Sequence, residues 1–241
     1  MTGRHGGFLD ETARAAEAGR IAEAYAARVG LEGLYADDAP DQRLRTAERT
    51  ALLAAGLAQR GLGPGRRVLE IGCGTGRELA RFVESGWSEA DLAGVDLLGD
   101  RVAEARLRLP GADLRIGDAA ALPWEDGCFA VVGQWTVMSS VLDDRMRAAI
   151  LAEAWRVLEP GGWLVSYDMR RVRPDRPLRP WTAAMLRTLL PEACEMEGHR
   201  LSLLPPLARR VARWPGLHDA LARVPFLQGH ELVWARKPER S

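Results

Sequence analysis

The middle of the chain alternates short apolar runs with amphipathic stretches. Apolar runs of strand length occupy 67–71, 91–97, 113–116, 129–134 and 163–168, and stretches with helical spacing lie between them at 77–85, 100–109 and 144–158. Strands separated by helices form βαβ units with right-handed crossovers, and such units build a parallel sheet that helices cover on both faces. The pattern therefore predicts a doubly wound, Rossmann-like α/β fold.

Different patterns flank this alternating region. Residues 11–29 and 43–60 have helical spacing and are separated by a break at 37–40, and the Gly/Pro-rich segment 61–65 ends the second helix. Near the other end, 195–204 and 228–236 are predicted strands that can pair antiparallel. We therefore expect an N-terminal helical segment, 1–60, and a core, 61–241, with a helical insertion at 205–226.

The insertion has a second possible interpretation. Leu207, Val211, Trp214 and Leu217 follow helical spacing, and arginines lie between them. A basic amphipathic helix of this kind can lie on a membrane surface. Because a Pro-Gly pair interrupts the pattern at 215–216, we favour a helix that packs on the sheet edge or caps the substrate pocket.

Charge and cysteine content limit the possible partners. Lys+Arg and Asp+Glu each number 33, and a nucleic-acid enzyme usually carries a basic surplus, so we expect no nucleic-acid partner. Cys73, Cys128 and Cys194 are far apart, which indicates neither a zinc site nor a disulfide framework and is consistent with a reducing compartment. No signal-peptide or membrane-spanning apolar run is visible. We expect a cytoplasmic protein without a metal, as a monomer or homodimer.

The strongest local motif is the loop Glu70-Ile-Gly-Cys-Gly-Thr-Gly76, between the first strand and its helix. Glycines there let a ligand approach backbone amides at a helix N-terminus. The dinucleotide fingerprint requires a further glycine where this chain has Arg77, so a pyrophosphate cofactor is disfavoured. Asp96 ends the second strand, where an acid can accept hydrogen bonds from both ribose hydroxyls. Asp118 ends the third strand and can accept from an adenine amino group.

These motifs in this order resemble the class I S-adenosylmethionine (SAM)-dependent methyltransferases, and the resemblance covers residues 66–168. It implies a seven-stranded sheet in the order 3-2-1-4-5-7-6 with strand 7 antiparallel, and an N-terminal helical lid over the cofactor. It also implies SAM as cofactor and S-adenosylhomocysteine as product. The family usually has an acid where this chain has Ala130. We interpret this as a minor variation, because the acid at that position is mainly structural.

The resemblance also implies which residues hold the cofactor. Glu70 and Gly72 would lie near the methionine amino group, Asp96 at the ribose, Asp118 with Ala119 at the adenine, and Gln134 near the methionine end. Cys73, Gly74, Gly76 and Leu97 complete the expected cofactor-binding set.

The acceptor must enter above the carboxyl ends of the strands. Asp168, where strand five meets the cleft, is the first candidate for a general base or substrate anchor; the alternatives are a cap or an arginine partner. His199 is the second catalytic candidate, and a surface or core histidine is the alternative. The expected substrate-binding residues are Tyr35, Trp135, Ser139, Tyr167 and Arg170.

The remaining motifs narrow the acceptor class. The Asn/Asp-Pro-Pro-aromatic sequence of many nucleic-acid and protein N-methyltransferases does not follow strand four. The stretch 134–143, together with 205–209 and the closing strand, resembles a bacterial subgroup of small methyltransferases. We therefore expect methyl transfer to a hydroxyl, carboxyl or amine of a small bacterial metabolite. The alternative is a methyltransferase-like, non-catalytic binding or scaffold module.

Overall fold

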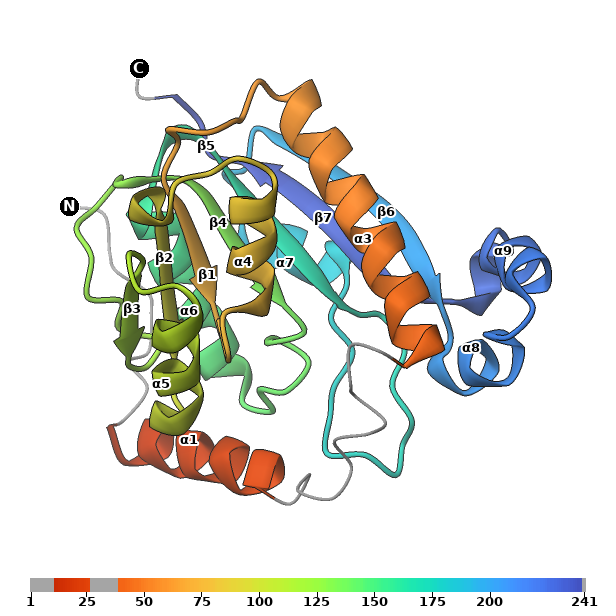
Figure 1. Ribbon diagram of the computed structural model, residues 1–241. Helices are drawn as coiled ribbons and strands as arrows, with labels where there is room; N and C mark the ends of the chain where they lie inside the picture. Colours follow the sequence, from red (N-terminus) through yellow and green to blue (C-terminus); the bar gives the residue numbers. More distant parts are fainter. Residues whose placement is uncertain (1–10, 27–38, 240–241) are drawn as a thin grey trace.

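A computed structural model of the chain describes residues 11–26 and 39–239. Its centre is one seven-stranded sheet in the order β3-β2-β1-β4-β5-β7-β6 (Figure 1). The strands are β1 (Val68–Ile71), β2 (Leu92–Asp96), β3 (Asp113–Ile116), β4 (Phe129–Trp135), β5 (Leu158–Met169), β6 (Glu195–Leu203) and β7 (Gln228–Arg236). The five strands of the alternating region pair in parallel, and β7 pairs antiparallel with both β5 and β6. The predicted fold class, strand order and direction of strand 7 are confirmed.

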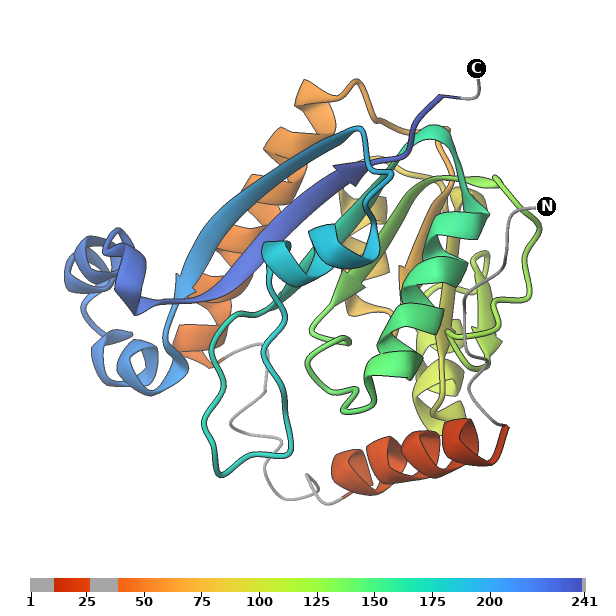
Figure 2. The same cartoon turned by 180° about the vertical axis from the view of Figure 1, so that it is seen from behind.

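The helices form layers on the two faces of the sheet. They are α1 (Glu11–Ala26), α3 (Pro40–Gln59), α4 (Arg77–Glu84), α5 (Gly99–Arg108), α6 (Asp144–Val157), α7 (Ala183–Leu189), α8 (Pro205–Val211) and α9 (Pro215–Ala222), with short 3-10 turns at Glu89–Asp91 and Pro225–Leu227. One face carries α3, α4 and α5 (Figure 1), and the other carries α6 and α7 (Figure 2). Helix α1 crosses the edge of the sheet where the parallel strands end.

Two hydrophobic cores hold these layers together. The central strands are buried on both faces, as the continuous apolar runs of β1, β2 and β4 predict. Trp234 of β7 is fully buried, and a Cβ on Gly56 of α3 would come within 2.4 Å of its ring. Only glycine therefore lets α3 lie this close to the sheet. The Arg60 guanidinium stacks at 4.3 Å from the rings of both Trp163 and Trp234.

Several element boundaries differ from the predicted ones. Helix α7 was not predicted, although Thr182 provides an N-cap whose side chain accepts a hydrogen bond from the Met185 amide. Helix α3 begins at Pro40, because proline at a first helical position needs no hydrogen-bond partner for its nitrogen. Strand β5 extends back to Leu158, through the predicted turn at 159–162. The predicted helix over 11–29 is described only as far as Ala26.

The insertion predicted at 205–226 is helical, but it is not one continuous helix. It consists of α8, α9 and a 3-10 turn, and α9 starts at Pro215, where the Pro-Gly pair interrupts the pattern. Within the described part of the chain, no helix is long and apolar enough to cross a membrane.

Candidate active site

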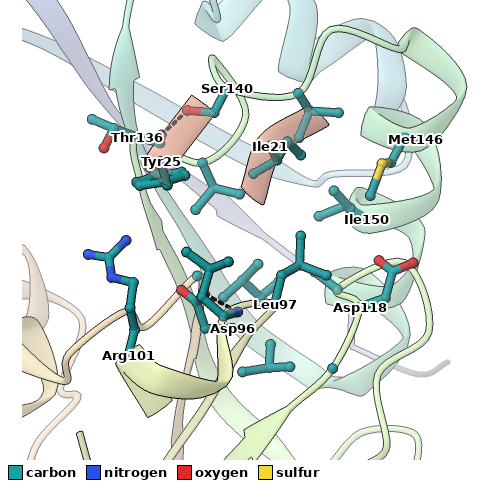
Figure 3. A pocket seen from close by; sticks show the side chains of 18 of the residues that line it. Ile21, Tyr25, Asp96, Leu97, Arg101, Asp118, Thr136, Ser140, Met146 and Ile150 are labelled. Atoms are coloured by element: carbon teal, nitrogen blue, oxygen red, sulfur yellow. Dashed lines mark hydrogen bonds between the residues drawn. The ribbon is translucent and has the colours of Figure 1, made fainter. Parts of the chain in front are cut away.

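A cavity lies at the carboxyl ends of β1, β2, β3 and β4, below helix α1 (Figure 3). Asp96 and Asp118 border it on one side, and Ile21 and Tyr25 of α1 face them from the other. The remaining walls come from the glycine loop, the turns after β2, β3 and β4, and the start of α6. They comprise Ile71, Gly72, Val95, Leu97, Leu98, Arg101, Gly117, Ala119, Trp135, Thr136, Val137, Ser140, Val141, Met146 and Ile150. The cavity occupies the position where ligands bind in open α/β sheets.

The glycine loop is shaped by backbone conformations that favour glycine. Gly72, Gly74 and Gly76 have φ values of +70°, +51° and +74°. A Cβ on Gly72 would lie 2.4 Å from the Val137 side chain, so any larger residue would displace the loop that follows β4. The Gly72 and Cys73 amides donate to the Val95 carbonyl at 2.8 and 3.0 Å, which attaches the loop to β2. The loop is therefore a rigid cradle that brings backbone close to the cavity.

Cys73 belongs to this loop, but its side chain points away from the cavity. A Cβ on Gly94 would lie 2.9 Å from the Cys73 sulfur, which shows how closely the thiol packs against β2. Burial raises the pKa of the Cys73 thiol, and the nearby Glu70 carboxylate raises it further. The neutral, buried thiol leaves only the backbone of Cys73 to take part in ligand binding.

Asp96 is held with its carboxylate at the cavity wall. Its Oδ2 accepts a hydrogen bond from the Gly74 amide at 2.8 Å, and its Oδ1 accepts from the Leu98 amide at 3.0 Å. A carboxylate oxygen can accept two hydrogen bonds, so each oxygen retains one acceptor position beyond these backbone contacts. Two adjacent acceptors in a fixed orientation fit a vicinal diol such as that of a ribose.

Asp118 combines a backbone contact with a contact to α1. Its Oδ1 accepts from the Ala120 amide at 2.8 Å, and its Oδ2 accepts from Nη2 and Nε of Arg14 at 2.8 and 3.0 Å. The ion pair joins α1 to the turn after β3, across the rim of the cavity. Nothing in the local pattern around Arg14 indicated this contact, because its partner lies more than a hundred positions later in the chain.

Glu70 lies at the end of β1 and is buried. Its Oε2 has no hydrogen-bond partner, and desolvation together with the nearby Glu78 carboxylate raises the pKa of Glu70 well above the usual range. An ammonium group bound at the adjacent glycine loop would supply the missing partner. The orphaned oxygen, the glycine cradle and the two acceptors of Asp96 together fit a ligand with an amino acid end and a nucleoside end.

Gln134 and Asp168 lie behind the cavity wall and do not line it. Gln134 donates from Nε2 to the Ser166 hydroxyl at 2.7 Å and accepts from the Val137 amide at 2.9 Å. Asp168 accepts from the Ser139 amide at 3.1 Å and from its neighbour's amide, that of Met169, at 2.7 Å. Burial raises the pKa of Asp168 to about 6. Both side chains hold the loop 136–140, whose other face borders the cavity.

The expected acceptor-binding residues are dispersed. Trp135 lines the cavity and donates from Nε1 to Glu78 Oε2 at 2.9 Å. Tyr167 is buried beneath α3, where its hydroxyl lies 3.0 Å from the Ser202 hydroxyl and its ring stacks on His230. Arg170 donates to the Gln228 carbonyl at 3.2 Å, outside the cavity lining.

Two of three further residues that the sequence predicted for the active site do not line the cavity. His199 lies on β6 at the sheet edge, paired with Glu197 at 2.9 Å, so the structure does not bring it to the cavity. Ser139 belongs to the loop after β4 but is fully buried and does not line the cavity. Tyr35 lies outside the described residues.

Sequence reasoning missed several residues of the cavity wall. Val137 belongs to the turn after β4, and Met146 with Ile150 forms one face of the first turns of α6. Met146 and Ile150 are four residues apart, which places them on one face of a helix, but this spacing does not indicate which surface that face covers. Arg101, at the start of α5, stacks at 5.0 Å on the Tyr25 ring across the cavity mouth.

Comparison with known proteins agrees with this geometry. Residues 68–162 match a family model described as a methyltransferase domain. The chain is 30% identical to a demethylmenaquinone methyltransferase of Beutenbergia cavernae over 174 residues, which cover 72% of the chain and 68% of that protein. It is 36% identical to a phthiotriol/phenolphthiotriol dimycocerosates methyltransferase of Mycobacterium ulcerans over 135 residues, which cover 55% of the chain and 47% of that protein.

The chain spans about half the length of the mycobacterial relatives that it matches. Among solved structures, a SAM-dependent methyltransferase from Archaeoglobus fulgidus superposes with a TM-score of 0.56 at 19% identity, covering 78% of this chain and 94% of that one. This likeness supports the fold.

Proposed function

Because the chain belongs to the class I SAM-dependent methyltransferases, we propose that it methylates a hydroxyl, carboxyl or amino group of a small-molecule acceptor. The chain is therefore an enzyme with SAM as its cofactor, and the alternative of a non-catalytic module is set aside. The observation that carries the proposal is the pair of carboxylates, Asp96 and Asp118, at consecutive strand ends beside the glycine loop.

The cofactor-binding residues proposed here follow from the contacts around the cavity. Asp96 would accept from the ribose hydroxyls, because its two oxygens are already oriented by the Gly74 and Leu98 amides. Asp118 and Ala119 would bind the adenine, between apolar walls that include Leu97 and Ile150. The unpartnered Glu70 oxygen would attract the ammonium of the methionine end.

When bound, SAM supplies a methyl group that its sulfonium already activates, so the protein mainly positions the nucleophile. The loop 136–140 would provide this positioning, since it borders the cavity beside the glycine loop. Thr136 and Ser140 supply hydroxyl groups to the lining, and Tyr25 supplies an aromatic face. Asp168 would act through this loop as a positioning residue, because its carboxylate is buried and bonded to the Ser139 amide.

The N-terminal segment would serve as a lid over the cofactor. Helix α1 supports this role, since Ile21 and Tyr25 line the cavity and Arg14 reaches Asp118. Helix α3 lies on the sheet face against β6 and β7, so within the described part of 1–60 the lid is α1. The cytoplasmic location and the monomeric or homodimeric state expected from the sequence remain predictions.

The names of two relatives support a small-molecule acceptor, since one is a methyltransferase of phthiotriol and phenolphthiotriol dimycocerosates and the other of demethylmenaquinone. Calorimetry with SAM and with S-adenosylhomocysteine tests the cofactor site first. We expect both to bind with sub-millimolar dissociation constants; binding of neither would overturn the proposal.

Release of S-adenosylhomocysteine, measured over a panel of phenols, aliphatic alcohols, carboxylic acids and amines, then tests the acceptor. We expect turnover with one class above the background without acceptor. Cofactor binding without turnover by any class would contradict the proposed acceptor, while leaving the cofactor site intact.

A further inference from the structure

The segment between β6 and β7, residues 205–227, forms a small projection with its own core. Ala208 and Val211 of α8 pack with Leu203 at the end of β6, and Leu207, Leu221, Ala222 and Leu227 surround them. Figures 1 and 2 show α8 and α9 projecting beside the sheet. Because the inward apolar side chains already have partners within the projection, its outward ones are not needed for its packing.

Large apolar side chains nevertheless remain exposed on the projection. Trp214, Leu217 and Phe226 are 49%, 46% and 64% exposed. In the described part of the chain, the other exposed large apolar residues are Leu107, Ile116 and Leu189, which belong to three separate elements. Half of this exposed apolar set therefore gathers on one short segment, which marks it as an interaction surface.

The charge of the projection indicates its partner. Residues 205–227 contain four arginines (Arg209, Arg210, Arg213 and Arg223) and a single acid, Asp219, in a chain whose net charge is zero. All four arginines are exposed, and the Arg213 guanidinium stacks at 4.4 Å on the Trp214 ring. In a symmetric contact with a second copy of the chain, the arginines of the two copies would repel each other. An anionic surface complements both the arginines and the apolar side chains.

The projection also lies at the carboxyl ends of the parallel strands, which is the side of the sheet on which the cavity opens. Strand β6 pairs antiparallel with β7, which pairs antiparallel with β5, so β6 runs in the direction of the parallel strands. The connection after β6 therefore emerges at their carboxyl ends. Arg171, in the loop after β5, donates to the Phe226 carbonyl at 2.7 Å and joins that loop to the projection.

We propose that the α8–α9 projection binds the surface of an anionic lipid bilayer, with Trp214, Leu217 and Phe226 inserted at the interface and the arginines on the headgroups. Aromatic and aliphatic side chains flanked by arginines suit the boundary between headgroups and acyl chains. This contact would hold the cavity edge near a membrane, where lipophilic molecules partition. It depends on no property of the cofactor site.

Vesicle flotation of the full chain tests the proposal, with phosphatidylcholine vesicles compared with vesicles that also contain phosphatidylglycerol. We expect flotation with the anionic vesicles, little with phosphatidylcholine alone, and a loss at 0.5 M salt, because salt screens the arginine contribution. Arg209→Gln with Arg210→Gln should lower the partition coefficient about fivefold for each arginine.

The triple variant Trp214→Ser, Leu217→Ser, Phe226→Ser should reduce binding to anionic vesicles by at least about tenfold. Leu107→Ser with Leu189→Ser removes exposed apolar side chains elsewhere and is the matched control, which should bind as the natural chain does. Unchanged circular dichroism and SAM affinity of each variant would show that the fold and the cofactor site are intact.

Three results would overturn the proposal. The natural chain could fail to float with anionic vesicles at low salt, or the control variant could lose binding as much as the triple variant does. The triple variant could instead change the sedimentation of the chain without changing vesicle binding, which would show that a second copy covers the surface. Each result leaves cofactor binding and methyl transfer to be judged by their own assays.

Discussion

At the scale of single residues, two aspartates at strand ends differ in what surrounds them. Asp96 borders the cavity, and each of its oxygens has one backbone donor. Asp168 lies one residue before the end of β5 but is only 1% exposed, and its oxygens accept from the Ser139 and Met169 amides. The first carboxylate is available to a ligand, whereas the second supports the wall that a ligand would contact.

Asp96→Ala should weaken SAM binding by about 1–3 kcal/mol, because the ribose hydroxyls would lose their acceptors on entering the cavity. Isothermal titration calorimetry measures the change in dissociation constant. Asp100→Ala, an exposed aspartate at the start of α5, is the control and should bind SAM normally. Unchanged affinity of the Asp96 variant would show that the ribose binds elsewhere.

Asp168 should make the stability of the protein depend on pH. Burial raises its pKa in the folded state to about 6 from the ordinary aspartate value of 3.8, so the folded state retains a proton that the unfolded state loses. The stabilising effect of this proton is complete below pH 4 and declines as pH rises toward 6. At higher pH, the buried charge costs about 3 kcal/mol relative to a side chain that stays neutral.

Asp168→Asn removes this titration. The free energy of unfolding of the variant, minus that of the natural chain, should therefore rise by about 2 kcal/mol between pH 4 and pH 7. Urea unfolding at a series of pH values measures the difference, and the exposed Asp100→Asn serves as control. A difference that stays constant over this range would show that Asp168 is already ionised in the folded protein at pH 4.

At the scale of elements, α1 is attached to the rest of the molecule by a few polar contacts at the cavity rim. Arg14 binds Asp118, and Glu17 accepts from the Leu142 amide at 2.5 Å. Arg20 binds Glu17 and donates to the Ser140 carbonyl at 2.5 Å. Of the residues of α1, Ile21 alone is buried, so the helix has little apolar attachment. Such an element can detach locally while the sheet stays folded.

Glu17→Ala should speed the dissociation of SAM about tenfold, because it removes both the contact to Leu142 and the partner of Arg20. Association should change less, since an opened lid does not obstruct entry. Stopped-flow fluorescence measures both rate constants. Glu23→Ala, on the exposed face of the same helix, is the matched control. Equal dissociation rates for the two variants would indicate that α1 does not retain the cofactor.

At the scale of the whole molecule, the cavity exists only when distant segments are assembled. Its lining joins α1, the ends of the first four strands and the start of α6, which together range from Ile21 to Ile150. An unfolded chain has no comparable site. Binding of the cofactor therefore stabilises the folded state by mass action.

SAM at a hundred times its dissociation constant should raise the free energy of unfolding by about 2.7 kcal/mol, which corresponds to a Tm increase of about 5–10 °C in a chain of this size. Removal of the ligand by dialysis should reverse the shift. Differential scanning fluorimetry measures it, and Asp96→Ala at the same SAM concentration should show a smaller one. A Tm that does not respond to SAM would contradict the assembled site.

Local patterns were sufficient for most of the fold. Residues 113–116 and 228–236 form strands at the predicted bounds, because alternation and apolar runs reflect burial that neighbours along the chain share. Helix α7 escaped prediction although Thr182 caps it, since a seven-residue helix has too few turns for a clear period. The insertion at 205–226 divides into two helices at Pro215, where the sequence already showed a Pro-Gly interruption of the apolar spacing.

The glycine loop with Asp96 and Asp118 was recognisable from the sequence alone, because each of these features lies at its own strand end, a position that the order of elements already determines. Tertiary structure alone decided whether each of the other candidate side chains faces the cavity. It placed Gln134 and Asp168 behind the cavity wall, placed His199 at the sheet edge, and brought Arg14 into contact with Asp118. Those outcomes depend on packing between segments far apart in the chain, and no local pattern encodes such distances.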